Sequence, residues 1–145
     1  MKKLFNKILC PVSFDENSIA ALEVARTLAQ DKDAVIYLLH VVPTPPVPVS
    51  PIPLEPFPQT EHDARARLRE LAETHLAGKV RYEMLALSGD PAHVIIRTVA
   101  DVGADSIVMA THGRKGVSRF FLGSVAERVV RESPCPVLTV RGKAQ

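Results

Sequence analysis

The chain has 145 residues, of which 46% are hydrophobic and 23% charged, and its formal net charge is +2. This length fits a single domain over residues 1–145, and the composition excludes a disordered chain. The 18 basic side chains are scattered among 16 acidic ones without a basic run, so nucleic acid is not an expected partner.

Five short apolar runs alternate with helical patterns along the chain. The expected strands are Ile8–Val12, Ala34–Val42, Val80–Leu87, Asp105–Ala110 and Val137–Arg141. Several of them are apolar at consecutive positions, which indicates a parallel sheet with helices on both faces.

Helical patterns fill the gaps between these strands. The first follows residues 15–18, the second runs from Thr60 to about Ala77, the third from Pro91 to Gly103, and the last from Ser124 to Glu132. Asp90 is the expected N-cap of the third helix, and Gly78 and Gly103 are expected at the left-handed positions that close helices. The alternating order, with right-handed crossovers, predicts an α/β fold with a doubly wound, open, five-stranded parallel sheet.

A proline-rich stretch over residues 43–58 follows the second strand and holds eight of the twelve prolines. Proline excludes helix and inner strand, so a polyproline II or irregular loop is expected. Two roles stay open for it: a semi-rigid connection, or a segment that covers the ligand crevice or docks a partner.

The segment after the fourth strand is punctuated by Gly113, Gly116 and Gly123, which let backbone N–H groups approach a ligand closely. In doubly wound sheets the ligand crevice lies at this edge, outside the carboxyl ends of the strands. Ser124 begins a helix whose first N–H groups favour an anion, and Arg114 supplies a guanidinium suited to phosphate oxygens. The segment therefore predicts a phosphate site.

A second interpretation of the same residues is structural. Ser124 and Glu127 have the spacing of a capping box, which would satisfy the N–H groups internally. Neither the G-x-x-x-x-G-K-[ST] nor the G-x-G-x-x-G pattern is present, which disfavours a P-loop NTPase and a dinucleotide dehydrogenase.

The remaining reactive side chains give no catalytic set. His40 and His112 lie near the carboxyl ends of the second and fourth expected strands without a carboxylate partner, so structural roles are expected, and His62, His75 and His93 are expected at solvated helix positions. Asp90 is explained as an N-cap, and no nucleophile, base and orienter combine by spacing. We expect no catalytic residue, no metal site and no enzyme beyond weak ATP hydrolysis.

The cysteines and the amino-terminal residues indicate in which cellular compartment the protein is expected. Cys10 and Cys135 lie far apart inside apolar strands and are expected to be small core residues. The basic residues 1–7 lead into a strand and not into a signal peptide, and no run reaches the ~18 apolar residues of a membrane span. We expect a cytoplasmic protein without a membrane partner.

Over nearly its whole length the chain resembles the universal stress protein family. The motifs are Lys7–Phe14, Leu38–Val42, Gly89–Ala92 and Ser133–Leu138, and the resemblance is densest over residues 105–141. The ATP-binding branch has the pattern G-x-x-G, nine residues, then G-[ST]. Here Gly113 and Gly123 match it, whereas Ala110 replaces the first glycine, and Ser13 stands where the family usually has Asp.

The resemblance implies a Rossmann-like fold of the adenine nucleotide alpha hydrolase type with strand order 3-2-1-4-5, holding ATP or a related adenine nucleotide, with or without Mg²⁺. The implied nucleotide-binding residues are Pro11, Val12, Ser13, Val41, Met109, Ala110, His112, Gly113, Arg114, Gly116, Gly123, Ser124 and Val125.

The resemblance also implies a homodimer that pairs the last strand at Val137, Leu138, Thr139 and Val140. An apolar edge strand without a central proline is itself prone to such pairing. The leading hypothesis is a stress-response protein that senses an adenine nucleotide and signals through its dimer to unknown protein partners. The alternatives are a nucleotide-free dimeric interaction module, favoured by Ala110 and Ser13, and a slow ATP hydrolase.

Overall fold

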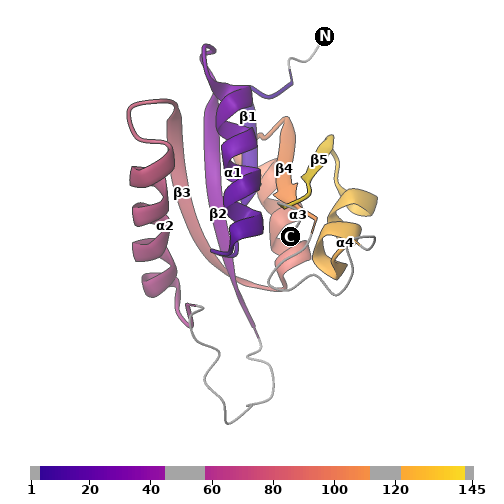
Figure 1. The fold of residues 1–145 in the computed structure, drawn as a ribbon. Coiled ribbons are helices and arrows are strands. Elements are labelled where there is room, and N and C mark those ends of the chain that lie inside the picture. The colour runs from indigo at the N-terminus through magenta and orange to yellow at the C-terminus, as the bar shows by residue number, and fades with distance from the viewer. Residues whose placement is uncertain (1–3, 45–57, 112–121, 143–145) are drawn as a thin grey trace.

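The structure, a computed structural model, describes residues 4–44, 58–111 and 122–142. Five parallel strands form one sheet in the order β3-β2-β1-β4-β5, with helices on both faces (Figure 1). The elements are β1 (Lys7–Pro11), α1 (Glu16–Ala29), β2 (Val35–Pro43), α2 (Glu61–His75), β3 (Arg81–Gly89), α3 (Pro91–Val102), β4 (Ser106–Ala110), α4 (Ser124–Glu132) and β5 (Val137–Val140). The predicted fold class and strand order are confirmed. No helix in the described ranges is long and apolar enough to cross a membrane.

Side chains fix the starts of three helices. Asp15, Thr60 and Asp90 each accept a backbone N–H from the first turn of the helix that follows, at 2.8 to 3.0 Å. Each cap replaces a hydrogen bond that the first turn cannot make internally. Asp90 is therefore an N-cap, as predicted, and Gly103 closes the same helix with a left-handed φ of 72°.

Helix α2 is shorter than predicted at both ends. Thr60 is its cap and lies outside the helix, which ends at His75. Beyond it, the N–H groups of Lys79 and Val80 both donate to the carbonyl of Leu76, which turns the chain toward β3. Gly78 lies in this turn with a φ of 78°, so the left-handed glycine was correctly predicted.

The sheet divides the core into two apolar clusters. Ile8 and Cys10 of β1 pack with α1 and α2 on one face, whereas Leu9 packs with α3 and α4 on the other. Figure 1 shows α1 and α2 in front of the sheet and α3 behind it. Such two-sided burial explains the continuous apolar runs of the strands.

The two cysteines differ in their surroundings. Cys10 is fully buried, and burial raises the pKa of its thiol to about 12. Cys135 was predicted inside a strand, but it precedes β5 and is half-buried, where its N–H donates to the Ser133 hydroxyl. The short strand begins only after Pro136, because proline cannot contribute an N–H to the ladder.

The amino end of the sheet is held by one carboxylate. The N–H groups of Phe5, Asn6 and Lys7 donate to Asp105 at 2.8, 3.0 and 2.8 Å, and the Ser106 hydroxyl donates to it at 2.8 Å. These contacts join the start of β1 to the start of β4 across a sequence separation of about 100 residues. Asp105 thereby supports the register of the two central strands.

The sheet reverses its strand order at β1. This strand pairs with β2 on one side and with β4 on the other, so the loops after β1 and β4 leave in opposite directions. Ligands of doubly wound sheets bind in the crevice that this divergence opens. β5 lies at a sheet edge, as predicted.

Candidate functional site

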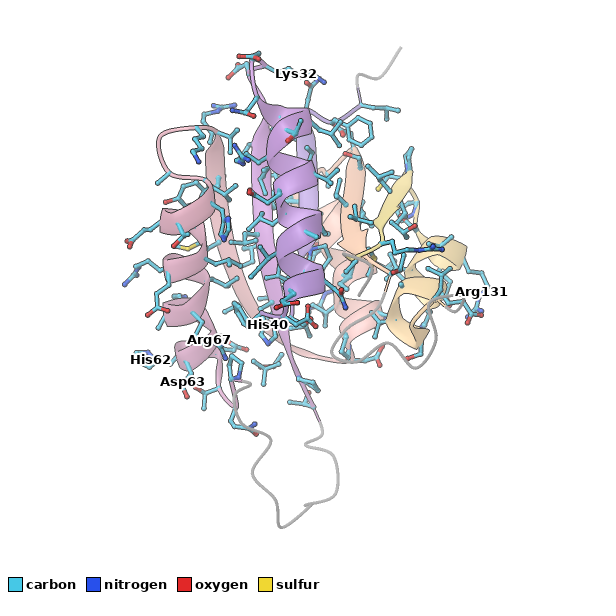
Figure 2. All side chains as sticks on the ribbon, in the orientation of Figure 1. Lys32, His40, His62, Asp63, Arg67 and Arg131 are labelled. Atoms are coloured by element: carbon cyan, nitrogen blue, oxygen red, sulfur yellow. The ribbon has the colours of Figure 1, made fainter. Side chains whose placement is uncertain are left out.

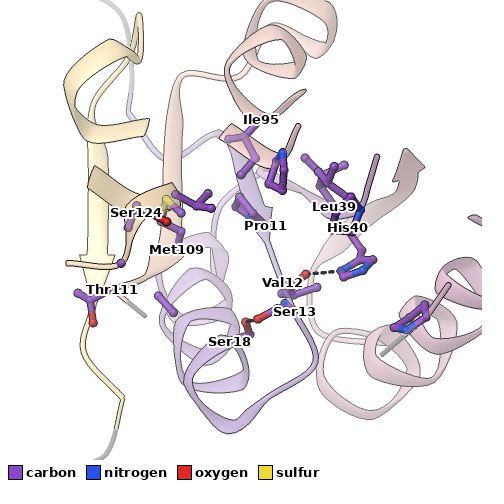
Figure 3. A pocket seen from close by; sticks show the side chains of 18 residues that line it. Pro11, Val12, Ser13, Ser18, Leu39, His40, Ile95, Met109, Thr111 and Ser124 are labelled. Carbon is purple, nitrogen blue, oxygen red and sulfur yellow. Dashed lines mark hydrogen bonds between the residues drawn. The ribbon is translucent and has the colours of Figure 1, made fainter. Parts of the chain in front are cut away.

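A pocket of about 440 Å³ lies at the carboxyl ends of β1, β2 and β4, beside the amino ends of α1, α3 and α4. Its volume is within the range of small-molecule sites. Figure 3 shows the side chains that line it. All predicted nucleotide-binding residues that the structure describes line this pocket: Pro11, Val12, Ser13, Val41, Met109, Ala110, Gly123, Ser124 and Val125.

Four predicted residues, His112, Gly113, Arg114 and Gly116, lie outside the described ranges. Their place relative to the pocket therefore stays a prediction. The segment that contains them leaves the described chain after Thr111 and returns at Leu122.

The walls of the pocket are mostly apolar. Pro11, Leu39, Val41, Ile95 and Met109 contribute hydrocarbon surface. Within the described ranges no lysine, arginine, aspartate or glutamate lines the pocket. The described wall therefore suits a flat, uncharged ring system, with polar contacts from hydroxyl and backbone groups.

Sequence reasoning missed several lining residues, including Ser18, Leu39, Pro58, Ile95 and Thr111. Thr111 directly follows β4, so the rule about carboxyl ends could have found it. Ser18 and Ile95 belong to α1 and α3, and the sequence carried no signal that these helix positions reach the crevice.

The loop between β1 and α1 carries a compact hydroxyl network. The N–H of Ser13 donates to the Ser18 hydroxyl at 2.9 Å, and the two hydroxyl oxygens are 3.0 Å apart. The Ser13 hydroxyl also donates to Asp15 at 3.2 Å. The carboxylate that the resemblance placed at position 13 is thus two residues further on, where it caps α1 and reaches the pocket wall through Ser13.

His40 is buried at the pocket end of β2, with 7% of its surface exposed. Its Nδ1 lies 2.7 Å from the carbonyl oxygen of Val12, and the Phe14 ring is 4.7 Å away between centroids. The predicted structural role of His40 is confirmed by this contact, although the residue also lines the pocket.

The other described histidines lie on helices, as predicted. His62 and His93 are exposed. His75 was predicted at a solvated position, but its side chain is only 20% exposed and lies 3.6 Å from Glu23. α1 and α2 pack side by side, which covers this last turn of α2.

The amino end of α4 differs from the other helix starts. Gly123 is its N-cap, and no side chain caps the helix. The predicted capping box of Ser124 and Glu127 is wrong. The Gly123 carbonyl accepts the Glu127 N–H at 2.8 Å, so the helix begins one residue too early for the box, and the Glu127 carboxylate pairs instead with Arg131 at 3.3 Å.

Three successive N–H groups, those of Ser124, Val125 and Ala126, consequently begin α4 without a side-chain acceptor in the described chain. All three residues line the pocket. Gly123 is held in place because its N–H donates to the Thr111 carbonyl at 2.6 Å. This end of the pocket therefore carries the positive end of a helix dipole.

Two further features border this end. Ala110 is the last residue of β4 and lines the pocket, where the resemblance expected glycine. Arg128, in the middle of α4, donates to the Asp90 carboxylate at 2.8 Å and so joins α4 to the start of α3. Within the described ranges, no group of three or more His, Cys, Asp or Glu residues is arranged to hold a metal ion.

Comparisons with known proteins agree with this architecture. Residues 4–141 match the model of the universal stress protein family. A universal stress protein of Methanocaldococcus jannaschii, MJ0531, is 34% identical over 146 aligned residues that cover 97% of this chain and 84% of the relative.

Two solved structures have the same fold. That of MJ0577, from the same organism, has a TM-score of 0.80 at 23% identity and covers 99% of this chain and 100% of the other. A universal stress protein solved in complex with cAMP has a TM-score of 0.71 at 21% identity, over 96% and 98% of the two chains. With the family match over residues 4–141, these findings show that the chain belongs to the universal stress protein family.

Proposed function

We propose that this protein binds ATP or a related adenine nucleotide in the pocket at the carboxyl ends of β1, β2 and β4. The proposal rests on one observation: mostly apolar walls and a helix start without a side-chain cap belong to one pocket of about 440 Å³. A nucleotide needs both surfaces, one for its base and one for its phosphate. A family protein of the same fold was solved with cAMP, which makes adenine nucleotides the first class to test.

The base is expected at the end where β1 and β2 finish. Leu39 and Val41 of β2 and the loop from Pro11 to Ser13 enclose this end with mostly apolar groups. A purine ring would bury its faces there. The Ser13 hydroxyl donates to Asp15 and accepts from Ser18, so it offers its remaining lone pair to a donor on the ligand.

The phosphate is expected at the start of α4. The N–H groups of Ser124, Val125 and Ala126 provide donors of fixed direction, and the helix dipole favours an anion by about 0.3–1 kcal/mol. Arg114 and the glycines at 113 and 116, which precede this helix in sequence, are proposed to complete the site. We further propose that any Mg²⁺ accompanies the phosphates and is not held by the described protein groups.

We also propose that the protein acts as a cytoplasmic, single-domain sensor that forms a homodimer through β5. Leu138 is 37% exposed on this edge strand. The carbonyls of Pro136 and Val140 face β4, so by alternation Thr139 directs its N–H outward. Thr139→Pro should remove an outward donor and leave the ladder to β4 intact.

Analytical ultracentrifugation tests the dimer. The wild-type chain should sediment as a dimer at micromolar concentration, and Thr139→Pro should sediment at the monomer mass of 15.8 kDa. A wild-type protein that sediments only at the monomer mass would contradict the proposed homodimer.

Two alternatives remain distinct from the binding proposal. A nucleotide-free interaction module is favoured by Ala110 and Ser13, which line the pocket where the resemblance expected glycine and aspartate. A slow hydrolase would need a base that no carboxylate lining the described pocket supplies. Calorimetric titration of nucleotide-free protein with ATP, AMP and cAMP, together with an assay of phosphate release from ATP, separates these. Saturable binding without phosphate release supports the sensor, no binding at millimolar nucleotide supports the module, and phosphate release that Gly123→Val abolishes supports the hydrolase.

A further inference from the structure

The buried imidazole of His40, at the pocket end of β2, makes a hydrogen bond that core packing alone does not require. His40 contacts the carbonyl of Val12 with its Nδ1 at 2.7 Å. A carbonyl oxygen only accepts hydrogen bonds, so Nδ1 must carry a proton and donate. This fixes the state of the ring nitrogen that faces Val12.

The contact holds a stretch of backbone that has already left the sheet. β1 ends at Pro11, yet the Val12 N–H donates to the Leu39 carbonyl at 2.8 Å and the Val12 carbonyl accepts from His40. Both polar groups of Val12 are therefore bound to β2. Figure 3 shows this hydrogen bond at the pocket wall, next to Ser13.

The loop beyond Val12 needs such restraint. Phe14 has a φ of 66°, in the left-handed region that non-glycine residues rarely adopt. A conformation of this kind persists only where its surroundings hold it. The Phe14 ring is tilted by 40° against the His40 ring, and the Arg67 guanidinium lies 4.6 Å from the centroid of the Phe14 ring.

Arg67 brings α2 into the same arrangement. Figure 2 shows Arg67 and His40 at the same end of the sheet, where the strands finish. The loop after β1, strand β2 and helix α2 thus meet at Val12, His40 and Arg67, with Phe14 in contact with both His40 and Arg67. Ser13, the residue between Val12 and Phe14, carries a hydroxyl group and lines the pocket.

We propose that His40 is a positioning residue of the nucleotide pocket: by holding the Val12 carbonyl, it sets the conformation in which Ser13 and the loop after β1 meet the ligand. The inference rests on the proposed function. It differs from a packing role because the essential feature is the hydrogen-bond donor and not the volume of the ring.

Two substitutions separate donor from volume. Asn at position 40 places an amide nitrogen near the location of Nδ1 and keeps a donor, whereas Leu fills similar space without one. Both lose the ring contact with Phe14, so both should lower thermal stability. His62→Leu on the exposed face of α2 is the matched control.

Calorimetry with ATP is the first measurement. His40→Asn should bind ATP within about threefold of wild type, and His40→Leu about tenfold more weakly, because an unpaired Val12 carbonyl releases the loop. Equal weakening in both variants, or no weakening in either, would overturn the inference.

Amide hydrogen exchange of Ser13 in the nucleotide-free protein is the second measurement. Exchange should be about tenfold faster in His40→Leu and near wild type in His40→Asn. If the wild-type protein binds neither ATP nor AMP, the proposed function fails, and exchange alone decides the inference. A difference between the two variants then supports it, and equal exchange overturns it.

A measurement on the unchanged protein covers the case in which the variants do not fold. Nitrogen-15 NMR of the His40 imidazole should show a proton on Nδ1. An unprotonated Nδ1 would overturn the inference, since such a nitrogen cannot donate to the Val12 carbonyl.

Discussion

Ser124→Pro tests the phosphate end of the pocket by removing one N–H group without disturbing the helix. Ser124 is the first residue of α4, and its N–H has no partner inside the helix. Proline is favoured at this position because its fixed φ suits a helix start. Gly123 already has φ −63° and ψ 157°, an extended conformation that a residue before proline adopts readily. Thermal stability should therefore stay near that of wild type.

The expected loss of affinity follows from one missing charge-assisted hydrogen bond. Such a bond contributes about 1.5–3 kcal/mol, so ATP should bind Ser124→Pro roughly 10- to 100-fold more weakly. Isothermal titration calorimetry measures this directly. Adenosine has no phosphate, so its affinity should be unchanged in the same variant.

Ser124→Ala is the control, because it removes the hydroxyl and keeps the backbone N–H. Its ATP affinity should stay within about threefold of wild type. If Ser124→Pro binds ATP as wild type does, the phosphate does not meet the start of α4. If the Pro and Ala variants weaken equally, the hydroxyl and not the amide makes the contact. Either result would refute the proposed geometry.

Three further predictions concern stability and reactivity. Asp105→Ala removes the acceptor of three backbone N–H groups, so it should lower the free energy of unfolding by about 2–3 kcal/mol. Scanning calorimetry should show a Tm lowered by roughly 5–10 °C. The control Asp101→Ala, at an exposed position, should change Tm little. Ellman's reagent should modify Cys135 slowly in native protein, because partial burial raises the pKa of its thiol. It should modify Cys10 only after unfolding, because full burial raises the pKa of that thiol to about 12. Modification of both thiols at once in native protein would contradict this. Partial burial raises the pKa of Glu23, but hydrogen bonds and positive charge from Arg26 of α1 and His75 of α2 lower it more. The pKa of this carboxyl is therefore below its ordinary 4.5. The contribution of this carboxylate to stability is therefore present above about pH 4.5 and is lost as the pH falls through the lowered pKa, so Glu23→Gln should cost a fraction of a kcal/mol in urea unfolding at neutral pH and progressively less on acidification below pH 4.5.

Local sequence signals predicted the fold well because they act over a few residues. Asp90, Pro91 and Gly103 bound α3 through cap and dihedral preferences that need no tertiary contact. The continuous apolar run of β2 likewise reflects burial on both faces of the sheet. Once these elements indicated a doubly wound sheet, the topological rule for such sheets placed the pocket at the carboxyl ends of the strands.

Features that depend on contacts between distant segments were not predictable. The capping box at Ser124 failed because Gly123, held by the Thr111 carbonyl, starts the helix one residue earlier. The approach of Ser18 to Ser13 and of His40 to Val12 likewise requires the folded loop after β1. These contacts determine which hydroxyl and N–H groups of the site are already hydrogen-bonded. The hydrophobic periodicity of the sequence indicates only where in the fold the site lies.

Chemical-shift mapping of the nitrogen-15-labelled protein with ATP tests whether the nucleotide binds in this pocket. Saturable shifts should cluster at Ser13, Val41, Ala110 and the start of α4, around one pocket. No shifts at millimolar ATP, or shifts centred on the groove between Lys7 and Arg81 at the opposite end of the sheet, would contradict it.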